Sequence, residues 1–310
     1  MVIFFSNPFL DVKPKVLLSF TPEVYEEEDG QSITLNGTAV QDVRWRIFNH
    51  LKRWQAIQIF KKDVFERDYN FERSPWMLRS RHRTRSIPTK NSCAVVGNGG
   101  VLLGSGCGEL IDSFDFVIRM NLAPYGGEFS RDVGSRLHLM TVNVQQLDAL
   151  IACTNTPPAT EGEIADDGNC SSLLQRLRGM DGRILWFFKR PRDLLAMKDM
   201  LAKLRTQHHL NFSFAYSPSP PMTAAKGLWH VDFPSTGLAL YTAATQFCRQ
   251  ILLFGYYPFT KDARNRTVRY HYYEKRDINY NANAHNMPGE YRILSNLNLT
   301  GAVRLVNDCS

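Results

Sequence analysis

A glycine-rich stretch is the part of the sequence whose residue types most clearly point to chemistry. The stretch Gly97–Gly100 directly follows residues 94–96, an apolar β-branched run that is typical of a buried strand. Glycine lets a chain turn tightly and lets the backbone approach a ligand. With a short helix near 107–111 and a second strand at 116–118, the pattern predicts the opening of a nucleotide-binding α/β sheet. A glycine turn alone is more often a tight connection.

The end of the second predicted strand argues against NAD as the nucleotide. Dinucleotide-dependent dehydrogenases usually place Asp or Glu there to bind the ribose hydroxyls. This chain has Arg119 and Asn121 in that region instead. An arginine can contact a 2′-phosphate, so an NADP-dependent oxidoreductase stays an alternative.

Two other places in the chain suit an anionic or polar ligand. Ser235 and Thr236 stand where a helix is expected to begin, and hydroxyl and backbone N–H groups at such a place can bind an anion. Simple N-capping is the alternative explanation. Asn143 follows a strand predicted at 137–142, at the edge where open α/β sheets bind ligands.

Two histidines are candidates for proton transfer. Imidazole ordinarily has a pKa of about 6.5, which suits acid–base work near neutral pH. His271 has Glu274 three positions later, and His285 has Glu290 five positions later. A single histidine is more often a surface or structural residue, so spacing alone assigns no role to either.

Hydrophobic periodicity predicts the elements that must position these residues. Apolar side chains at spacings of three and four indicate an amphipathic helix from Val43 to Phe65, with a basic polar face. Further helices and strands are expected in the second half of the chain: helices at 191–206 and from Phe233 to about Gln250, and strands at 184–188 and 251–255.

Composition describes a globular protein with a modest positive charge. The chain has 310 residues, 44% hydrophobic and 22% charged, with a formal net charge of +7. No segment approaches the roughly 20 apolar residues of a membrane-spanning helix. The basic cluster Arg79–Arg85 has neither interleaved aromatic residues nor zinc-finger spacing, so we expect no nucleic-acid partner. A polyanionic glycan and a plain solvated linker remain open as explanations.

Glycosylation sequons and cysteines favour the secretory pathway. Asn-x-Ser/Thr sequons occur at Asn36, Asn169, Asn211, Asn265 and Asn298. The six cysteines allow many pairings, and six reduced thiols in a cytosolic protein are the alternative. Cys153 and Cys170 flank one polar loop, where a local bridge and two free thiols fit equally well.

Four segments, in order along the chain, resemble the motifs of the eukaryotic sialyltransferases. Residues 93–134 resemble the large sialyl motif, and the Asn-Leu-Ala-Pro form at 121–124 is that of the α2,8-sialyltransferase branch, which includes oligo- and polysialyltransferases. Residues 233–259 resemble the small motif. His271-Tyr-Tyr-Glu274 resembles the third motif, with Glu in place of the usual Asp, and 285–290 resembles the very short motif.

The resemblance implies a fold and an activity. The fold would be α/β, with a Rossmann-like, mostly parallel sheet flanked by helices, of the variant GT-A glycosyltransferase type. The activity would be inverting transfer of sialic acid from CMP-sialic acid to the 8-hydroxyl of a terminal sialic acid on a glycan. The expected division is an extended or poorly ordered segment 1–42, a basic helix and linker 43–90 packed on the catalytic domain, and the catalytic domain 91–310.

The resemblance also implies roles for single residues. His285 would be the general base, and His271 would steady the phosphate of the departing CMP. The nucleotide and the sialic acid carboxylate would be bound by further residues, with Gly255 beside the nucleotide: Asn98, Asn121, Ser235, Thr236 and Gly237. Disulfides would join Cys93 to Cys248 and Cys107 to Cys309.

Cofactor, metal and location complete these expectations. The chain has no Asp-x-Asp diad of the metal-dependent glycosyltransferases, and CMP is a good leaving group, so we expect neither metal nor cofactor. Family members lie in the Golgi lumen, held by an N-terminal type II membrane anchor that is absent from this chain and is expected in the full-length protein. A catalytically inactive module that binds sialoglycans is a second alternative.

Overall fold

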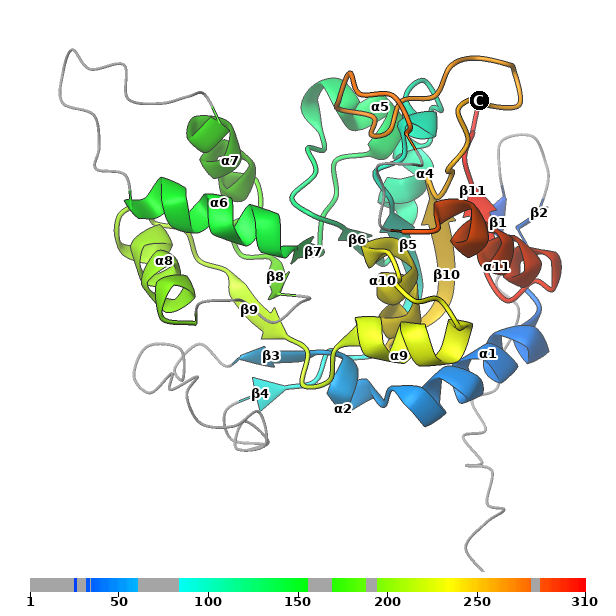
Figure 1. The fold of residues 1–310 in the computed structure, drawn as a ribbon, viewed down its shortest axis with the longest axis horizontal. Helices are drawn as coiled ribbons and strands as arrows, with labels where there is room; N and C mark the ends of the chain where they lie inside the picture. Colours follow the sequence, from blue (N-terminus) through cyan, green and yellow to red (C-terminus); the bar gives the residue numbers. More distant parts are fainter. Residues whose placement is uncertain are drawn as a thin grey trace, which may run out of the picture.

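A nine-stranded sheet with helices on both faces forms the centre of the structure (Figure 1). The structure is a computed structural model, and it describes residues 25–26, 32–33, 35–60, 84–155, 169–187, 194–279 and 285–310. The strand order is β11-β10-β5-β6-β7-β8-β9-β3-β4, and β1 and β2 form a separate pair. The strands are β1 Tyr25–Glu26, β2 Ser32–Ile33, β3 Gln58–Phe60, β4 Thr84–Arg85, β5 Lys90–Val96, β6 Phe116–Arg119, β7 Leu139–Val142, β8 Ile184–Phe187, β9 Ser213–Tyr216, β10 Cys248–Phe254 and β11 Arg304–Val306.

The sheet is parallel except at one edge. Every neighbouring pair from β11 to β9 is parallel, whereas β3 pairs antiparallel with both β9 and β4. Strands β6 to β9 extend from β5 in one direction, and β10 and β11 lie on its other side. The connection reverses between β5 and β10, and open α/β sheets bind ligands beyond the carboxyl ends of the strands at such a reversal. The predicted Rossmann-like, mostly parallel sheet is confirmed.

The helices cover both faces because side chains alternate along each buried strand. In β5, Cys93 and Val95 pack into one core cluster, and Ala94 and Val96 pack into another on the opposite face. The first face carries α1, α9, α10 and α11; the second carries α4 near β5 and α6, α7 and α8 near β7 to β9. The helices are α1 Gly37–His50, α2 Arg53–Ala56, α4 Gly108–Ser113, α5 Ser130–Val133, α6 Val144–Asn155, α7 Asn169–Arg178, α8 Leu194–Thr206, α9 Pro221–Trp229, α10 Thr236–Ala244 and α11 Met287–Leu299, with 3-10 turns at Gly100–Leu102 and Gly127–Phe129.

The helix predicted from Val43 to Phe65 is wrong in its second half. Helix α1 ends at His50, because the capping residue Leu51 is extended, with φ −147° and ψ 105°. After the short α2 the chain forms β3, which pairs with β9 and β4. The apolar run at 57–60 is compatible with a helix or with a buried strand, and pairing with the sheet edge decides for the strand.

The helix predicted from Phe233 to Gln250 is too long. Helix α10 ends at Ala244, and β10 begins at Cys248, earlier than the strand expected at 251–255. Cys248 pairs with Lys90 in the register of β10 against β5, and it is also bonded to Cys93. Pairing with β5 therefore makes residues 248–250 part of the strand, although the local sequence predicts a helix there.

The division into three segments stays a prediction, and the described residues add one fact to it. Strands β3 and β4 fall within 43–90, and they belong to the same sheet as the rest of the chain. The predicted helix start at 191–193, most of the loop at 153–170 and most of the basic cluster Arg79–Arg85 lie outside the described residues. In the part that the structure does describe, no helix is both long and apolar enough to cross a bilayer.

All six cysteines are paired in disulfides. Cys93–Cys248 joins β5 to β10, with the two Cα atoms 5.9 Å apart. Cys107–Cys309 joins the start of α4 to the C-terminal end, and Cys153–Cys170 joins α6 to α7. The two bridges that the resemblance implied are confirmed, and Cys153–Cys170, which the sequence left open, is a bridge as well.

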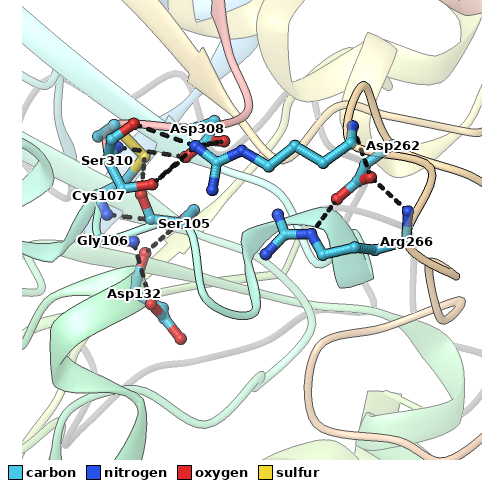
Figure 2. Close-up of polar contacts among 10 residues, drawn as sticks. Ser105, Gly106, Cys107, Asp132, Asp262, Arg266, Asp308 and Ser310 are labelled. Carbon is cyan, nitrogen blue, oxygen red and sulfur yellow. Dashed lines mark hydrogen bonds and ion pairs between the residues drawn. A yellow bond between two sulfur atoms is a disulfide. The ribbon is translucent and has the colours of Figure 1, made fainter.

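The C-terminal residues are fastened to the loop that follows the glycine stretch (Figure 2). Beside the Cys107–Cys309 bridge, the backbone N–H of Cys309 donates to the carbonyl of Ser105 at 2.8 Å. Arg264 pairs with Asp308 at 2.9 Å, which brings the loop after β10 to the same place. The carboxylate of Asp132 accepts the N–H groups of the loop glycines on the other side, and the contacts are Gly104 at 2.7 Å and Gly106 at 3.1 Å.

Candidate active site

A cavity of about 640 Å³ lies beyond the carboxyl ends of β5 and β10. It is at the reversal in strand order, where the topology predicts a ligand site. All nine site residues named from the sequence line this cavity: Asn98, Asn121, Asn143, Ser235, Thr236, Gly237, Gly255, His271 and His285. The structure therefore brings together residues that lie as far apart in the sequence as Asn98 and His285.

The two glycine turns approach each other so closely that side chains are excluded. An added Cβ at Gly99 would lie 2.3 Å from the carbonyl oxygen of Gly255, and one at Gly97 would lie 2.9 Å from that of Phe254. Gly255 itself has φ +70°, a backbone conformation that other residues rarely adopt. The glycines serve a tight contact between the ends of two strands, and Gly97, Gly99 and Gly255 all line the cavity.

Asparagine and glutamine side chains offer unused acceptors to a ligand. The amide of Asn98 donates to the carbonyl of Met120 at 3.3 Å, which fixes the side chain between β5 and β6. Asn121 adopts a left-handed conformation, φ 58°, with its N–H on the hydroxyl of Thr141. Its Oδ1 and the Oε1 of Gln146 are buried without a hydrogen-bond partner in the described part of the chain. Buried acceptors of this kind need donors, and hydroxyl or amino groups of a ligand would supply them.

Asn143 has a structural task as well as a place in the lining. Its Oδ1 accepts the backbone N–H of Gln146 at 3.0 Å, at the start of α6. This is the contact of an N-capping residue. The cap leaves the amide nitrogen of Asn143 for other contacts.

Ser235 caps α10 and is held by a buried carboxylate. Its backbone N–H and its hydroxyl donate to the two oxygens of Glu290, at 2.7 Å and 2.5 Å. Its Oγ also accepts the N–H of Leu238 at 3.1 Å. The hydroxyl proton is therefore engaged, and Thr236 and Gly237 present the first turn of α10 to the cavity. Burial raises the pKa of the Glu290 carboxyl, and the bonds from Ser235 lower it.

His271 is tied to both the glycine loop and a glutamate. It forms an isolated antiparallel bridge with Gly99, and the N–H of Tyr272 donates to the carbonyl of Asn98 at 3.0 Å. Its Nδ1 lies 2.9 Å from Oε1 of Glu274. A carboxylate accepts hydrogen bonds, so Nδ1 carries a proton, and Nε2 is the nitrogen left for a ligand.

His285 has a fixed tautomer for a similar reason. Its Nδ1 lies 2.8 Å from the carbonyl oxygen of Phe233, which can only accept a hydrogen bond. Nδ1 therefore carries the proton, and Nε2 of the neutral ring keeps its lone pair. The next residue, Asn286, caps α11, which also carries Glu290. Helix α11 thus places both members of the His-x4-Glu pattern in the cavity wall.

Arg119 is the residue on which the alternative of an NADP-dependent oxidoreductase depends, and it does not line the cavity. Its side chain is almost completely buried, and it donates to the carbonyls of Arg136 at 3.0 Å and Val133 at 2.6 Å. Burial lowers its pKa to about 10, while Tyr272, Asp112 and Tyr125 act in the opposite direction. The guanidinium is committed to the protein interior, so it cannot meet a 2′-phosphate.

Sequence reasoning assigned no role to several lining residues. Glu290 was visible only as part of a spacing pattern, and its contact with Ser235 depends on residues 55 positions apart. Tyr256 also lines the cavity, with its hydroxyl donating to the carbonyl of Gly237 at 3.3 Å. Burial, which is the largest cause, and the nearby Glu290 both raise the pKa of Tyr256. The sequence signal that could have identified Tyr256 is its place directly after Gly255, at the end of a predicted strand.

Metal ligands do not gather in the described part of the structure. Among those residues, no group of three or more His, Cys, Asp and Glu side chains is placed to hold an ion. Catalysis without metal or cofactor stays a prediction.

Comparisons with known proteins agree with the motif order. Residues 41–161 and 176–302 match glycosyltransferase family 29 (sialyltransferase). A chimpanzee (Pan troglodytes) protein named alpha-2,8-sialyltransferase 8F is 32% identical over 232 residues, which are 69% of this chain and 52% of that protein. The chain thus spans about half the length of this curated relative.

Two similar solved structures are described as a mammalian sialyltransferase, one of them in complex with Gal-beta-1-3GalNAc-ortho-nitrophenol. They are 21% and 20% identical to this chain and have TM-scores of 0.44 and 0.45. Each alignment covers 87% of this chain and 79% of the other. The match to the family covers residues 41–161 and 176–302, which are most of the chain. The chain belongs to glycosyltransferase family 29, the sialyltransferases.

Proposed function

We propose that the protein is an inverting α2,8-sialyltransferase that moves sialic acid from CMP-sialic acid to the 8-hydroxyl of a terminal sialic acid on a glycoprotein or glycolipid glycan. One observation carries the proposal. In a chain of family 29, a single cavity is lined by the glycines at the strand ends, by the two histidines and by the hydrogen-bonded pair Ser235–Glu290. The α2,8 linkage is taken from the name of the chimpanzee relative.

His285 acts as the general base in this proposal. The Phe233 carbonyl holds the proton on Nδ1, so the lone pair of Nε2 is free to accept one. As the 8-oxygen forms a bond to C2 of the donor sialic acid, its proton passes to Nε2. The bond between C2 and the phosphate oxygen breaks at the same time, and its electron pair leaves with CMP. Attack from the face opposite the leaving group inverts the anomeric centre.

Binding of the donor falls to three groups. With the ring of His271 protonated on both nitrogens, Nδ1–H donates to Glu274 and Nε2–H donates to the phosphate of CMP. The first turn of α10, at Thr236 and Gly237, has N–H groups without intrahelical partners and would bind the carboxylate of the donor sialic acid. Asn98, Asn121 and Asn143 would hold the nucleotide, beside Gly255. No metal or cofactor enters the proposal.

The secretory pathway, with residence in the Golgi lumen, is the proposed location. Three disulfides in one chain suit an oxidising compartment.

The test is an incubation with CMP-sialic acid and a defined sialylated acceptor such as sialyllactose. We expect CMP to be released in step with an acceptor product that carries one more sialic acid, in a linkage cleaved by an α2,8-specific sialidase. Lactose, the same acceptor without its sialic acid, is the control and should give no product. Transfer to lactose at the same rate would contradict the proposed acceptor.

A further inference from the structure

The positive charge of the cavity lining is concentrated in one residue. Among the described lining residues, Arg276 is the one side chain with a permanent positive charge. The two lining carboxylates already have partners, because Glu274 contacts His271 and Glu290 contacts Ser235. An anion that enters this cavity therefore finds one uncommitted fixed cation in the described part of its wall.

Arg276 is placed one aromatic ring away from His271. The backbone N–H of Tyr270 donates to the carbonyl of Arg276 at 2.8 Å, so the two residues face each other across a tight loop. The guanidinium carbon lies 4.8 Å from the centre of the Tyr270 ring, and that ring lies 4.3 Å from the ring of His271. The stack orients the guanidinium without neutralising it.

The guanidinium has no carboxylate partner. Within the described residues Arg276 forms no ion pair, whereas Arg264 and Arg266, in the preceding loop, both do. The side chain is also exposed, so a ligand can reach it from solvent. An arginine that is held in direction and left unpaired can bind a carboxylate through two parallel hydrogen bonds.

The proposed reaction brings in three anionic groups and leaves one of them without a partner. CMP-sialic acid carries a phosphate and a carboxylate, for which His271 and the first turn of α10 are available. The acceptor sialic acid carries a second carboxylate, at its C1. We infer, on the basis of the proposed function, that Arg276 binds the C1 carboxylate of the acceptor sialic acid and so selects sialylated acceptors over uncharged ones.

The experiment compares two acceptors on two enzymes. The acceptors are sialyllactose and its C1 amide, which has the same shape without the negative charge. With wild-type protein the amide should lose about 10- to 100-fold in kcat/KM, the usual value of a hydrogen-bonded charge. Arg276→Ala should lose a similar factor on sialyllactose, mainly through the acceptor KM, and should then treat the two acceptors alike. The KM for CMP-sialic acid should not change.

Two control variants define what the result means. Lys275→Ala removes the same charge from the neighbouring exposed position, which does not line the cavity, and should keep the discrimination of the wild type. Arg276→Lys keeps the charge without the planar fork and should recover part of the discrimination. The alanine substitution leaves the backbone bond from Tyr270 in place, and thermal melting checks that the variant folds.

The outcomes that overturn the inference can be told apart from failure of the proposed function. If the wild type is active and Arg276→Ala still prefers the carboxylate, Arg276 does not bind it. If Arg276→Ala raises the KM for CMP-sialic acid and weakens CMP binding, the arginine serves the donor phosphate instead. If wild-type protein releases no CMP with either acceptor and none with other sialylated acceptors, the proposed function is wrong, and the inference falls with it.

Discussion

Glu290 holds Ser235 through two hydrogen bonds, one from the backbone N–H at 2.7 Å and one from the hydroxyl at 2.5 Å. The contact fastens the start of α10 to the first turn of α11. Thr236 and Gly237 on one helix and His285 just before the other are therefore held in one arrangement. The carboxylate is buried, so it acts by positioning the two helix starts and not through contact with solvent.

Replacing Glu290 with Gln should damage both stability and donor binding. The amide can accept one of the two hydrogen bonds but presents an NH₂ group to the other donor. Because hydrogen bonds to charged groups contribute about 1.5–3 kcal/mol, we expect a clear loss in the free energy of unfolding and weaker CMP binding. Urea denaturation and CMP titration measure the two effects.

Glu109→Gln is the matched control, because Glu109 lies in the first turn of α4 and is exposed. It should change neither quantity. If Glu290→Gln binds CMP as the wild type does, the contact with Ser235 does not position the donor site.

The disulfides should differ in their contribution to stability. Cys93–Cys248 closes a separation of 155 residues and Cys153–Cys170 one of 17. Chain-entropy models assign about 5 kcal/mol to the longer loop and about 3 kcal/mol to the shorter one. Replacing each pair with serine should lower the melting temperature more for Cys93/Cys248. A larger loss for Cys153/Cys170 would contradict this ranking.

Acid should weaken the fold through His138. Its Nδ1 accepts the backbone N–H of Val117 at 2.9 Å, which requires the neutral ring. Burial, with Arg136, Arg183 and Lys90, lowers its pKa to about 4, against an ordinary value of 6.5. Between these values the unfolded chain binds a proton that the folded chain does not, so stability falls as the pH falls through this window.

His138→Asn keeps an acceptor for Val117 and removes the titration. The free energy of unfolding of the wild type should fall more steeply than that of the variant between pH 6.5 and pH 4. Denaturant titrations at several pH values measure both slopes. Parallel curves for the two proteins would show that His138 does not contribute.

Chelation should leave activity intact. In the proposed mechanism the phosphate charge meets His271, and the first turn of α10 meets the donor carboxylate, so no divalent ion is needed. Turnover measured before and after dialysis against EDTA should be the same. Activity that is lost with EDTA and restored by Mn²⁺ or Mg²⁺ would mean that the donor site has been assigned wrongly.

The sequence was sufficient for the parts of the molecule that local patterns control. The strand before Gly97, the helix start at Ser235 and the buried strand at 184–187 all follow from apolar runs and capping residues, and the structure has each of them. Asn98, Asn121, Asn143 and Gly255 lie together because the carboxyl ends of parallel strands meet at one edge of the sheet.

Long-range contacts are what the sequence could not supply. Strand β3 was predicted as helix because its partner β9 lies more than 150 residues away. The task of Glu290 depends on Ser235, and the unpaired state of Arg276 depends on which carboxylates lie near it. A spacing pattern contains neither fact. Strand β9 and helix α9 are not among the predicted elements; Pro220 caps α9 and Pro221 is its first residue.

The central claim is that His285 takes the proton of the acceptor hydroxyl and that His271 binds the phosphate of CMP. The most direct test measures turnover and CMP affinity for both His285→Ala and His271→Ala. A placed general base contributes about 10²- to 10⁴-fold, so His285→Ala should lose that factor in kcat and bind CMP as the wild type does. His271→Ala should lose both turnover and CMP affinity. Near-normal turnover in His285→Ala would contradict the account, because the base would then be another group.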